Sequence, residues 1–217
     1  MKPDFDKAAT KATETLIDYG ITSAPVSPLP ILKSIPGVLV ISFAEMSESV
    51  GLGRHEILSV FSNHQDAVTS CILDNGEQKY VVAYNQMLPI NVAQRALARQ
   101  LGHILLHHDG SRPDEVRTAE SYCFAYHLLC PRALIRSVQE AGIDFTLNVM
   151  NNMTGCDEMC IDGMKNTPGA NVPAELNRKI KNQFAAYVAN FVNYQRTVPG
   201  SVSALIDFGT YLDNYKG

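Results

Sequence analysis

Two short stretches, residues 99–108 and 120–131, hold the residue types of this chain that are best suited to chemistry. A zinc-peptidase site of the thermolysin type needs two histidines one helical turn apart, a glutamate beside the first histidine as general base, and a third ligand from another helix. His103 stands where the second histidine would be, and Glu120 is a candidate for the third ligand. The pattern is therefore that of a zinc site in which part of the residue set has been replaced.

The replaced positions are Arg99 and Gln100, which stand where the first histidine and the glutamate would be. A guanidinium group stays protonated and has no lone pair to offer, so Arg99 is excluded as a metal ligand. A primary amide does not take a proton from a metal-bound water at neutral pH, so Gln100 is excluded as a general base. No catalytic residue is therefore assigned, and the degenerate site consists of Arg99, Gln100, His103 and Glu120.

The loss of a metal would have an electrostatic consequence at this site. Without the dication, Glu120 would be an unpaired carboxylate in a cleft, which is energetically costly. A cation at position 99 restores the balance of charge. We therefore expect the side chain of Arg99 to reach Glu120.

A rewired metal site is the alternative. His103 and His107 are again one helical turn apart, and Glu120, His108 or His127 could join them as ligands. The candidate metal ligands are thus His103, His107 and Glu120. No resident cofactor is expected, with zinc as the alternative.

Two helices must position these residues. Projection of a helix over residues 91–107 at about 100° per residue places the polar residues of the first stretch on one face and an apolar stripe on the other. Gly102 in this helix allows another segment to approach closely. A second helix, which begins after Pro113 and ends before Pro131, carries Glu120.

The remaining pattern predicts a small sheet before these helices and more helices after them. A β-branched run at residues 38–43 and a hairpin pattern at residues 67–73 and 79–84 predict three strands. Further helices are expected over residues 4–19, around Leu32, and over residues 57–61, 133–141, 147–153, 156–164, 173–194 and 204–215.

With these two helices in place, the chain resembles the ImmA/IrrE family of zinc metallo-endopeptidases. Members typically carry a helix of the form Leu-Ala-His-Glu-Leu-Gly-His-x-x-Leu-His and then a helix of the form Glu-Ala-Asn-x-Phe-Ala-x-x-Leu-Leu-x-Pro. The corresponding stretches here read Leu97-Ala98-Arg99-Gln100-Leu101-Gly102-His103-Ile104-Leu105-Leu106-His107 and Glu120-Ser121-Tyr122-Cys123-Phe124-Ala125-Tyr126-His127-Leu128-Leu129-Cys130-Pro131. The resemblance runs from about Asp4 to Pro131 and is weaker beyond.

The resemblance implies an α+β fold, with a zincin-like metallopeptidase core, a small and mostly antiparallel sheet, and a helical C-terminal portion. A metallopeptidase-type domain is expected over residues 1–135, with a helical region over residues 136–217 packed on it. In the family, the glutamate at the position of Glu120 is the third zinc ligand.

The resemblance also implies a function. Members commonly cut helix-turn-helix repressors of mobile elements or stress regulons. We therefore expect a catalytically degenerate relative, inactive as a zinc peptidase, that binds a protein partner such as a repressor. The alternatives are an active metal-dependent endopeptidase with a rewired site, and a DNA-associated regulator built on the C-terminal helices.

Composition narrows the classes of protein. The 217 residues are 46% hydrophobic and 18% charged, as in an ordinary globular protein. A net charge of −4 argues against direct nucleic-acid binding, and the basic run at residues 177–181 is more typical of a solvated helix face. The sequence shows no membrane-spanning run and no secretion signal at its start, so a cytoplasmic location is expected.

The cysteines point to the same compartment. Their number, five, is odd and lacks the spacing of a disulfide framework, which fits a reducing environment. Cys156 and Cys160 lie at i and i+4, but no second pair completes a four-ligand zinc site. Both are expected to be free thiols.

Overall fold

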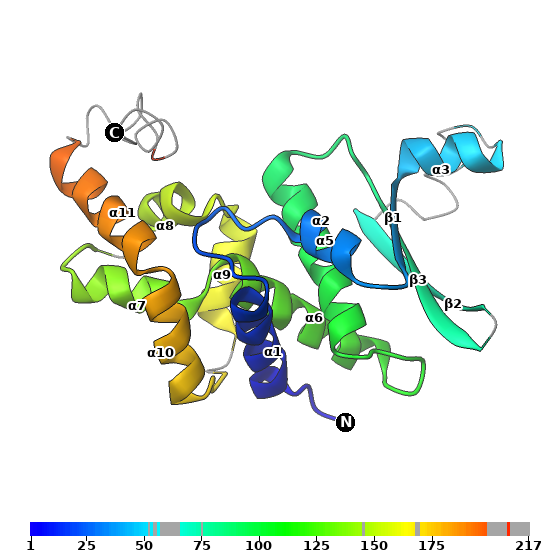
Figure 1. The fold of residues 1–217 in the computed structure, drawn as a ribbon, viewed down its shortest axis with the longest axis horizontal. Coiled ribbons are helices and arrows are strands. Elements are labelled where there is room, and N and C mark those ends of the chain that lie inside the picture. The colour runs from blue at the N-terminus through cyan, green and yellow to red at the C-terminus, as the bar shows by residue number, and fades with distance from the viewer. Residues whose placement is uncertain are drawn as a thin grey trace. The chain divides into compact units, whose positions relative to one another are not determined.

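The computed structural model describes residues 1–51, 53, 56, 66–74, 76–144, 146–167, 170–198 and 208 of the chain. Helices predominate over these residues, and three strands form one small sheet (Figure 1). The helices are α1 Phe5–Asp18, α2 Pro28–Ser34, α3 Phe43–Val50, α5 Ile90–Leu105, α6 Asp114–Leu129, α7 Arg132–Glu140, α8 Leu147–Thr154, α9 Glu158–Asn166, α10 Ala174–Gln183 and α11 Ala185–Thr197. The strands are β1 Val38–Ser42, β2 Ala67–Asp74 and β3 Glu77–Tyr84. The predicted α+β fold class is confirmed.

The sheet has the strand order β1-β3-β2, with β3 in the centre. β2 and β3 form the predicted antiparallel hairpin, in which Ala67 lies opposite Tyr84, and Gly76 in the turn takes a φ of +84° that favours glycine. β1 lies parallel to β3. The sheet is therefore mixed, with its longer pair antiparallel as expected. The parallel pairing of β1 was not predicted, because the residue pattern of a strand does not carry the direction of its neighbour.

Different helices cover the two faces of the sheet. On one face, Phe43 of α3 packs with Ala83 of β3 to form a small core. Side chains alternate along a strand, so Thr69 and Val82, each next in sequence to a residue of that face, point to the other. There α5 contacts β2 and β3. The helix with the first chemical stretch is thus held directly against the sheet.

α5 and α6 approach one another closely at a glycine. A Cβ atom at Gly102 would lie 3.0–3.2 Å from side-chain atoms of Phe124, which is fully buried in α6. The predicted close approach at Gly102 is confirmed. Because Glu120 precedes Phe124 by one helical turn, this contact brings the two chemical stretches together.

After α6 the chain is helical as predicted, but some helix bounds differ. The single helix expected over residues 173–194 is wrong, because Phe184, with φ −95° and ψ 5°, separates α10 from α11 and is fully buried. α9 begins at Glu158 because the side chain of Asp157 caps it by accepting a hydrogen bond from the backbone N–H of Cys160. The helix expected over residues 57–61 and most of that over residues 204–215 lie outside the described residues.

The chain divides into two compact units. The sheet unit comprises Met1–Asp4 and Ser27–Ala125, and the helical unit comprises Phe5–Val26 and Tyr126–Gly217. This division follows contacts, and the domain boundary expected between residues 135 and 136 stays a prediction. Over the described part of the chain, every helix is too short or too polar to cross a membrane.

Candidate functional site

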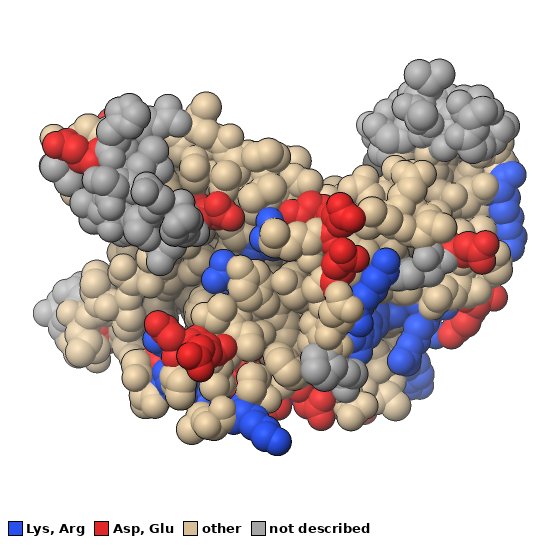
Figure 2. Space-filling model, turned by 180° about the vertical axis from the view of Figure 1, so that it is seen from behind, with Lys and Arg blue, Asp and Glu red and all other residues tan. Residues whose placement is uncertain are grey.

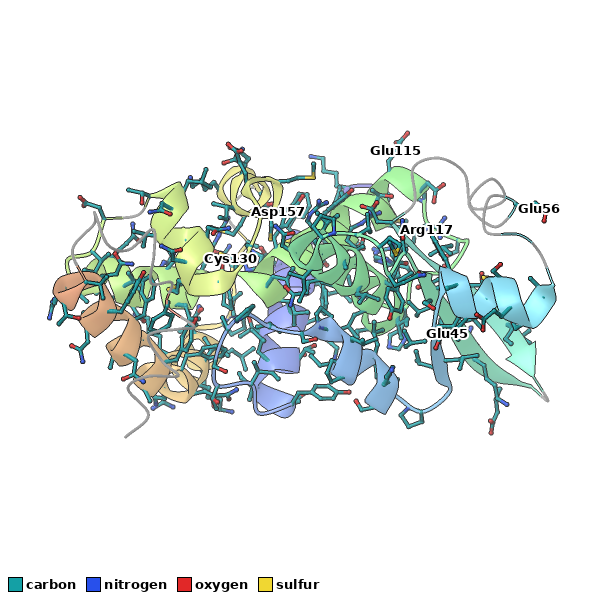
Figure 3. All side chains as sticks on the ribbon, turned by 90° about the horizontal axis from the view of Figure 1, so that it is seen from above. Glu45, Glu56, Glu115, Arg117, Cys130 and Asp157 are labelled. Carbon is teal, nitrogen blue, oxygen red and sulfur yellow. The ribbon has the colours of Figure 1, made fainter. Side chains whose placement is uncertain are left out.

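A cavity of about 800 Å³ in the sheet unit lies where α5 and α6 meet the edge strand β2. α5 contributes Arg99, Gln100 and His103 to its wall, so these three predicted residues share one site. α6 contributes Arg117 and Tyr122, and Figure 3 shows Arg117 between α6 and the sheet. We call this cavity the cleft.

Gln100, at the position of the general base, ties α5 to the edge strand. The hydroxyl of Thr69 donates a hydrogen bond to its Oε1 over 2.9 Å, and its Nε2 donates to the carbonyl oxygen of Ala67 over 3.0 Å. Gln100 is only 5% exposed. Both ends of the amide are thus used within the protein, and the residue has a structural role that periodicity did not reveal.

Glu120 lies at the centre of a buried polar network. Its Oε1 accepts a hydrogen bond from the backbone N–H of Asp4 over 2.8 Å. Its Oε2 lies 2.9 Å from Nε2 of His108 and 2.6 Å from Nη1 of Arg112. Nδ1 of His108 lies 2.9 Å from Nδ1 of His103. Both carboxylate oxygens therefore have partners, and the partners include a guanidinium group.

The expected contact between Arg99 and Glu120 is wrong. The guanidinium carbon of Arg99 lies 4.1 Å from the ring centre of Tyr122, in a cation–π contact across α5 and α6. The charge of Glu120 is balanced by Arg112 instead, from the loop before α6. An arginine does compensate the carboxylate, but it lies outside both motif stretches, where neither the resemblance nor the helical projection pointed.

The end of α5 explains why His108, rather than His107, enters the network. α5 ends at Leu105, and His107 takes a left-handed φ of +55°. The N–H of His107 bonds to the carbonyl of Ile104 over 3.1 Å, and that of His108 to the carbonyl of His103 over 3.0 Å. These bonds form a Schellman motif, which turns His108 back onto His103. His107 is exposed, so the structure does not bring the candidate pair His103 and His107 together with Glu120.

The imidazoles of the network favour the neutral state. Burial, together with the neighbouring positive charges, lowers the pKa of His103 from 6.5 to about 3. Burial also lowers the pKa of His108, although Glu120 opposes this shift. Two neutral rings fit the distances if His108 donates from Nε2 to Glu120 and His103 donates from Nδ1 to His108. Nε2 of His103 then carries a free lone pair.

The donor set does not fit a zinc ion. A catalytic zinc site uses three protein ligands, but here both oxygens of Glu120 are engaged and His103 offers a single nitrogen. The cations Arg99 and Arg117 also line the cleft. Over the described part of the chain, no three His, Cys, Asp or Glu side chains are grouped so as to hold a metal.

The other candidate residues lie in the helical unit. His127 lines a second, smaller cavity there. Cys156 and Cys160 are free and buried, and so is Cys130, which the spacing of the cysteines did not connect with them. Hydrogen bonds from Cys130 and Cys160 hold the pKa of Cys156 well below its usual value.

The small sheet with α5 and α6 packed beside it defines a zincin-like fold of the metallopeptidase type. Residues 55–152 match the family model described as the IrrE N-terminal-like domain, Peptidase_M78. This match confirms the resemblance to the ImmA/IrrE family that the two motifs indicate. No curated protein and no solved structure matched the chain.

Proposed function

We propose that this protein is a catalytically degenerate member of its family, which keeps the peptidase cleft as a metal-free binding site for an extended segment of a partner protein. One observation carries the proposal: both oxygens of Glu120, the residue at the position of the third zinc ligand, are held by Asp4, His108 and Arg112. A carboxylate with this set of partners has little capacity left for a metal. Free cysteines support a cytoplasmic location as part of the same proposal.

The loss of peptidase chemistry follows from named groups. Metal-assisted hydrolysis needs a base to take a proton from the attacking water. The amide at position 100 is not a base, and its hydrogen bonds to Thr69 and Ala67 hold it against β2. Restoring activity would therefore require breaking contacts that now support the fold.

The cleft retains features that suit a peptide. β2 is an edge strand of the described sheet, and its residues Thr69 and Cys71 line the cleft, so an extended segment could pair beside it. Nε of Arg99 and Nε of Arg117 are buried, with no hydrogen-bond partner among the described residues. Nη2 of Arg117 pairs with Asp114, but the Nε donors of the two arginines stay available in the cleft and favour a carboxylate. We therefore propose an acidic extended segment, with a helix-turn-helix repressor as the partner by family analogy.

A direct role in DNA binding is less well supported. α8 and α9, joined by residues 155–157 with Gly155 at φ +68°, have the form of a helix-turn-helix. The second helix, however, exposes Glu158 and Asp162, whose charge repels phosphates. On the face shown in Figure 2, the basic side chains that stand together on one side of the view have acidic ones beside them.

Metal content and peptide selection test the proposal together. The full chain, purified without an affinity tag, is expected to hold far less than one zinc per molecule. Stoichiometric zinc that is lost in Glu120→Gln, together with chelator-sensitive cleavage of a repressor, would establish the active endopeptidase instead.

The peptide arm uses a displayed library of linear peptides. The wild type is expected to select sequences rich in Asp and Glu, and Arg117→Gln to lose this preference. Arg178→Gln, an exposed arginine on α10, is the matched control and should keep it. If wild type and Arg117→Gln select the same peptides, the assignment of an acidic segment is wrong.

A further inference from the structure

The helical unit contains a cavity of about 80 Å³ that is lined by hydrogen-bond donors. A single water needs only roughly 10–15 Å³ on the same scale. The polar residues that line it are His127, Arg132, Arg136, Asn171, Asn177 and Thr13. No aspartate or glutamate occurs among its described lining residues. The cavity therefore combines positive charge with the absence of a lining carboxylate.

The first turn of α7 opens at this cavity. Its N-cap is Pro131, which offers no side-chain hydrogen bond to the helix start. The backbone N–H groups of Arg132 and Ala133, both lining residues, have no partner within the helix at these positions. A helix start of this kind carries a partial positive charge and binds anions.

His127 supplies an independent sign of a missing ligand. The residue is 2% exposed, and its Nε2 atom has no hydrogen-bond partner among the described residues. Burial, and then the charge of Arg132, lowers the pKa of His127 from 6.5 to about 4, so the ring is neutral at neutral pH. Its Nε2 is then free to carry a proton and donate it to an acceptor in the cavity.

The two arginines differ in how they are held. Nη2 of Arg132 donates to the carbonyl oxygens of Met164 and Thr167, over 3.1 and 2.9 Å, which fixes the guanidinium at the end of α9. Arg136 is exposed and forms no ion pair within the described part of the chain. Neither arginine is neutralised by a described carboxylate.

The nearby carboxylate of Asp6 is engaged elsewhere. It is exposed and accepts a hydrogen bond from the backbone N–H of Asn171 over 2.8 Å. The side-chain amide of Asn177 donates to the carbonyl of Val172 over 2.9 Å, which holds the wall of the cavity in place. The wall is thus preformed, and its remaining donors face a common space.

We propose that this cavity is a binding site for a small oxyanion, a phosphate or a carboxylate group, which accepts hydrogen bonds from His127, from the two arginines and from the first turn of α7. Arginine pairs with either group through parallel N–H···O bonds. The proposal rests on the helical unit alone and is independent of the function proposed for the cleft.

Titration of the full chain with inorganic phosphate tests the site, with chloride at equal ionic strength as the reference. The expected result is saturable binding by calorimetry and a shift of the His127 Nε2 resonance in long-range ¹H–¹⁵N spectra. Arg136→Gln should weaken binding about tenfold, the effect of losing one charge-assisted pair. Arg136 is exposed, so this variant is expected to fold normally.

Arg178→Gln is the matched control, because it removes the same charge from an exposed position of α10 that is not among the lining residues of the cavity. It should bind phosphate like the wild type. Equal weakening in both variants, or saturation without a shift at His127, would show non-specific attraction and overturn the proposal. No saturable binding would show that water alone fills the cavity. Methyl phosphate and acetate distinguish the two classes of oxyanion. A site for phosphate groups is expected to bind methyl phosphate more tightly than acetate, whereas a site for carboxylate groups is expected to bind both.

Discussion

The buried polar groups of the Glu120 network have protein partners, whereas those of the cavity of about 80 Å³ in the helical unit, the His127 cavity, do not all have them. Around Glu120, both carboxylate oxygens have protein partners: Arg112 and His108 hold one oxygen and the backbone of Asp4 holds the other. Around His127, one buried nitrogen and a helix start lack partners among the described residues. Buried polar groups are normally satisfied, so a satisfied cluster serves the fold and an unsatisfied one indicates a ligand.

The residues with unsatisfied polar groups are therefore not those that the zinc-site pattern of the sequence indicates. The motif stretches point to Glu120, both of whose oxygens have protein partners. His127 lies in the same motif stretch, where the sequence indicates no more than an additional metal ligand. If the Glu120 network has a structural role, substitutions there lower stability, whereas the His127 cavity responds to an added anion.

The largest expected effect is that of Glu120→Ala. The substitution leaves Arg112 and the N–H of Asp4 without their acceptor, and we expect the free energy of unfolding to fall by about 3–5 kcal/mol. Denaturation in urea measures this. Glu115→Ala, at an exposed carboxylate on the same helix (Figure 3), should change stability by no more than about 0.5 kcal/mol. Equal effects of the two substitutions would contradict a structural role for Glu120.

A smaller effect on the free energy of unfolding should distinguish Arg112 from Arg99. Arg112→Gln should cost about 1.5–3 kcal/mol, because it breaks a hydrogen-bonded ion pair to a buried carboxylate. Arg99→Gln removes a partly exposed cation–π contact and should cost below about 1 kcal/mol. Combining each with Glu120→Gln measures the coupling by unfolding. Coupling is expected for Arg112 only, and coupling of Arg99 instead would restore the rejected pairing.

A glutamate at position 100 is expected to lower the stability of the fold without restoring peptidase activity. In Gln100→Glu, a carboxylate would face the carbonyl oxygen of Ala67, and the donor to that oxygen would be lost. A cost of about 1–3 kcal/mol follows, read as a lower urea midpoint. Gln100→Met, which removes both hydrogen bonds without adding charge, is the matched control. Arg99→His combined with Gln100→Glu should still fail to bind zinc, and stoichiometric zinc there would show that the Glu120 network opens readily.

Local patterns predicted the parts of this protein that depend on local sequence. The hairpin of β2 and β3, the two motif helices and the close approach at Gly102 follow from alternation, helical spacing and the absence of a side chain. The break at Phe184 could not be predicted, because the apolar periodicity continues through it and tertiary burial decides it. Burial of a large side chain outweighed the helical pattern there.

The Glu120 network, too, depends on tertiary contacts that local sequence patterns do not predict. Its members come from the N-terminus, the end of α5, a loop and α6, so only the fold brings them together. The end of α5 does carry a signal in the sequence, since Asp109 and Gly110 follow the two histidines and indicate a turn. Nothing in the sequence around Arg112 indicates that its side chain pairs with Glu120. An arginine does compensate the charge of Glu120 as electrostatics predicts, but the arginine is Arg112 and not Arg99.

The last prediction compares His103 and His127 through pH. Both have folded-state pKa values, about 3 and about 4, below the ordinary 6.5. As pH falls below 6.5, the unfolded chain takes up protons that the folded chain does not. The free energy of unfolding therefore declines as the pH approaches the folded-state pKa values, by at most about 1.4 kcal/mol per pH unit for each group. Above 6.5 these groups contribute no slope. Urea denaturation over a pH series should show the decline, and His107→Gln, an exposed control, should leave it unchanged.

Phosphate, if it occupies the His127 cavity, stabilises the protonated ring, raises the pKa of His127 and reduces its share of the slope, while His103 titrates as before. A phosphate effect on His103 in NMR titrations, or none on His127, would remove the distinction between the two regions.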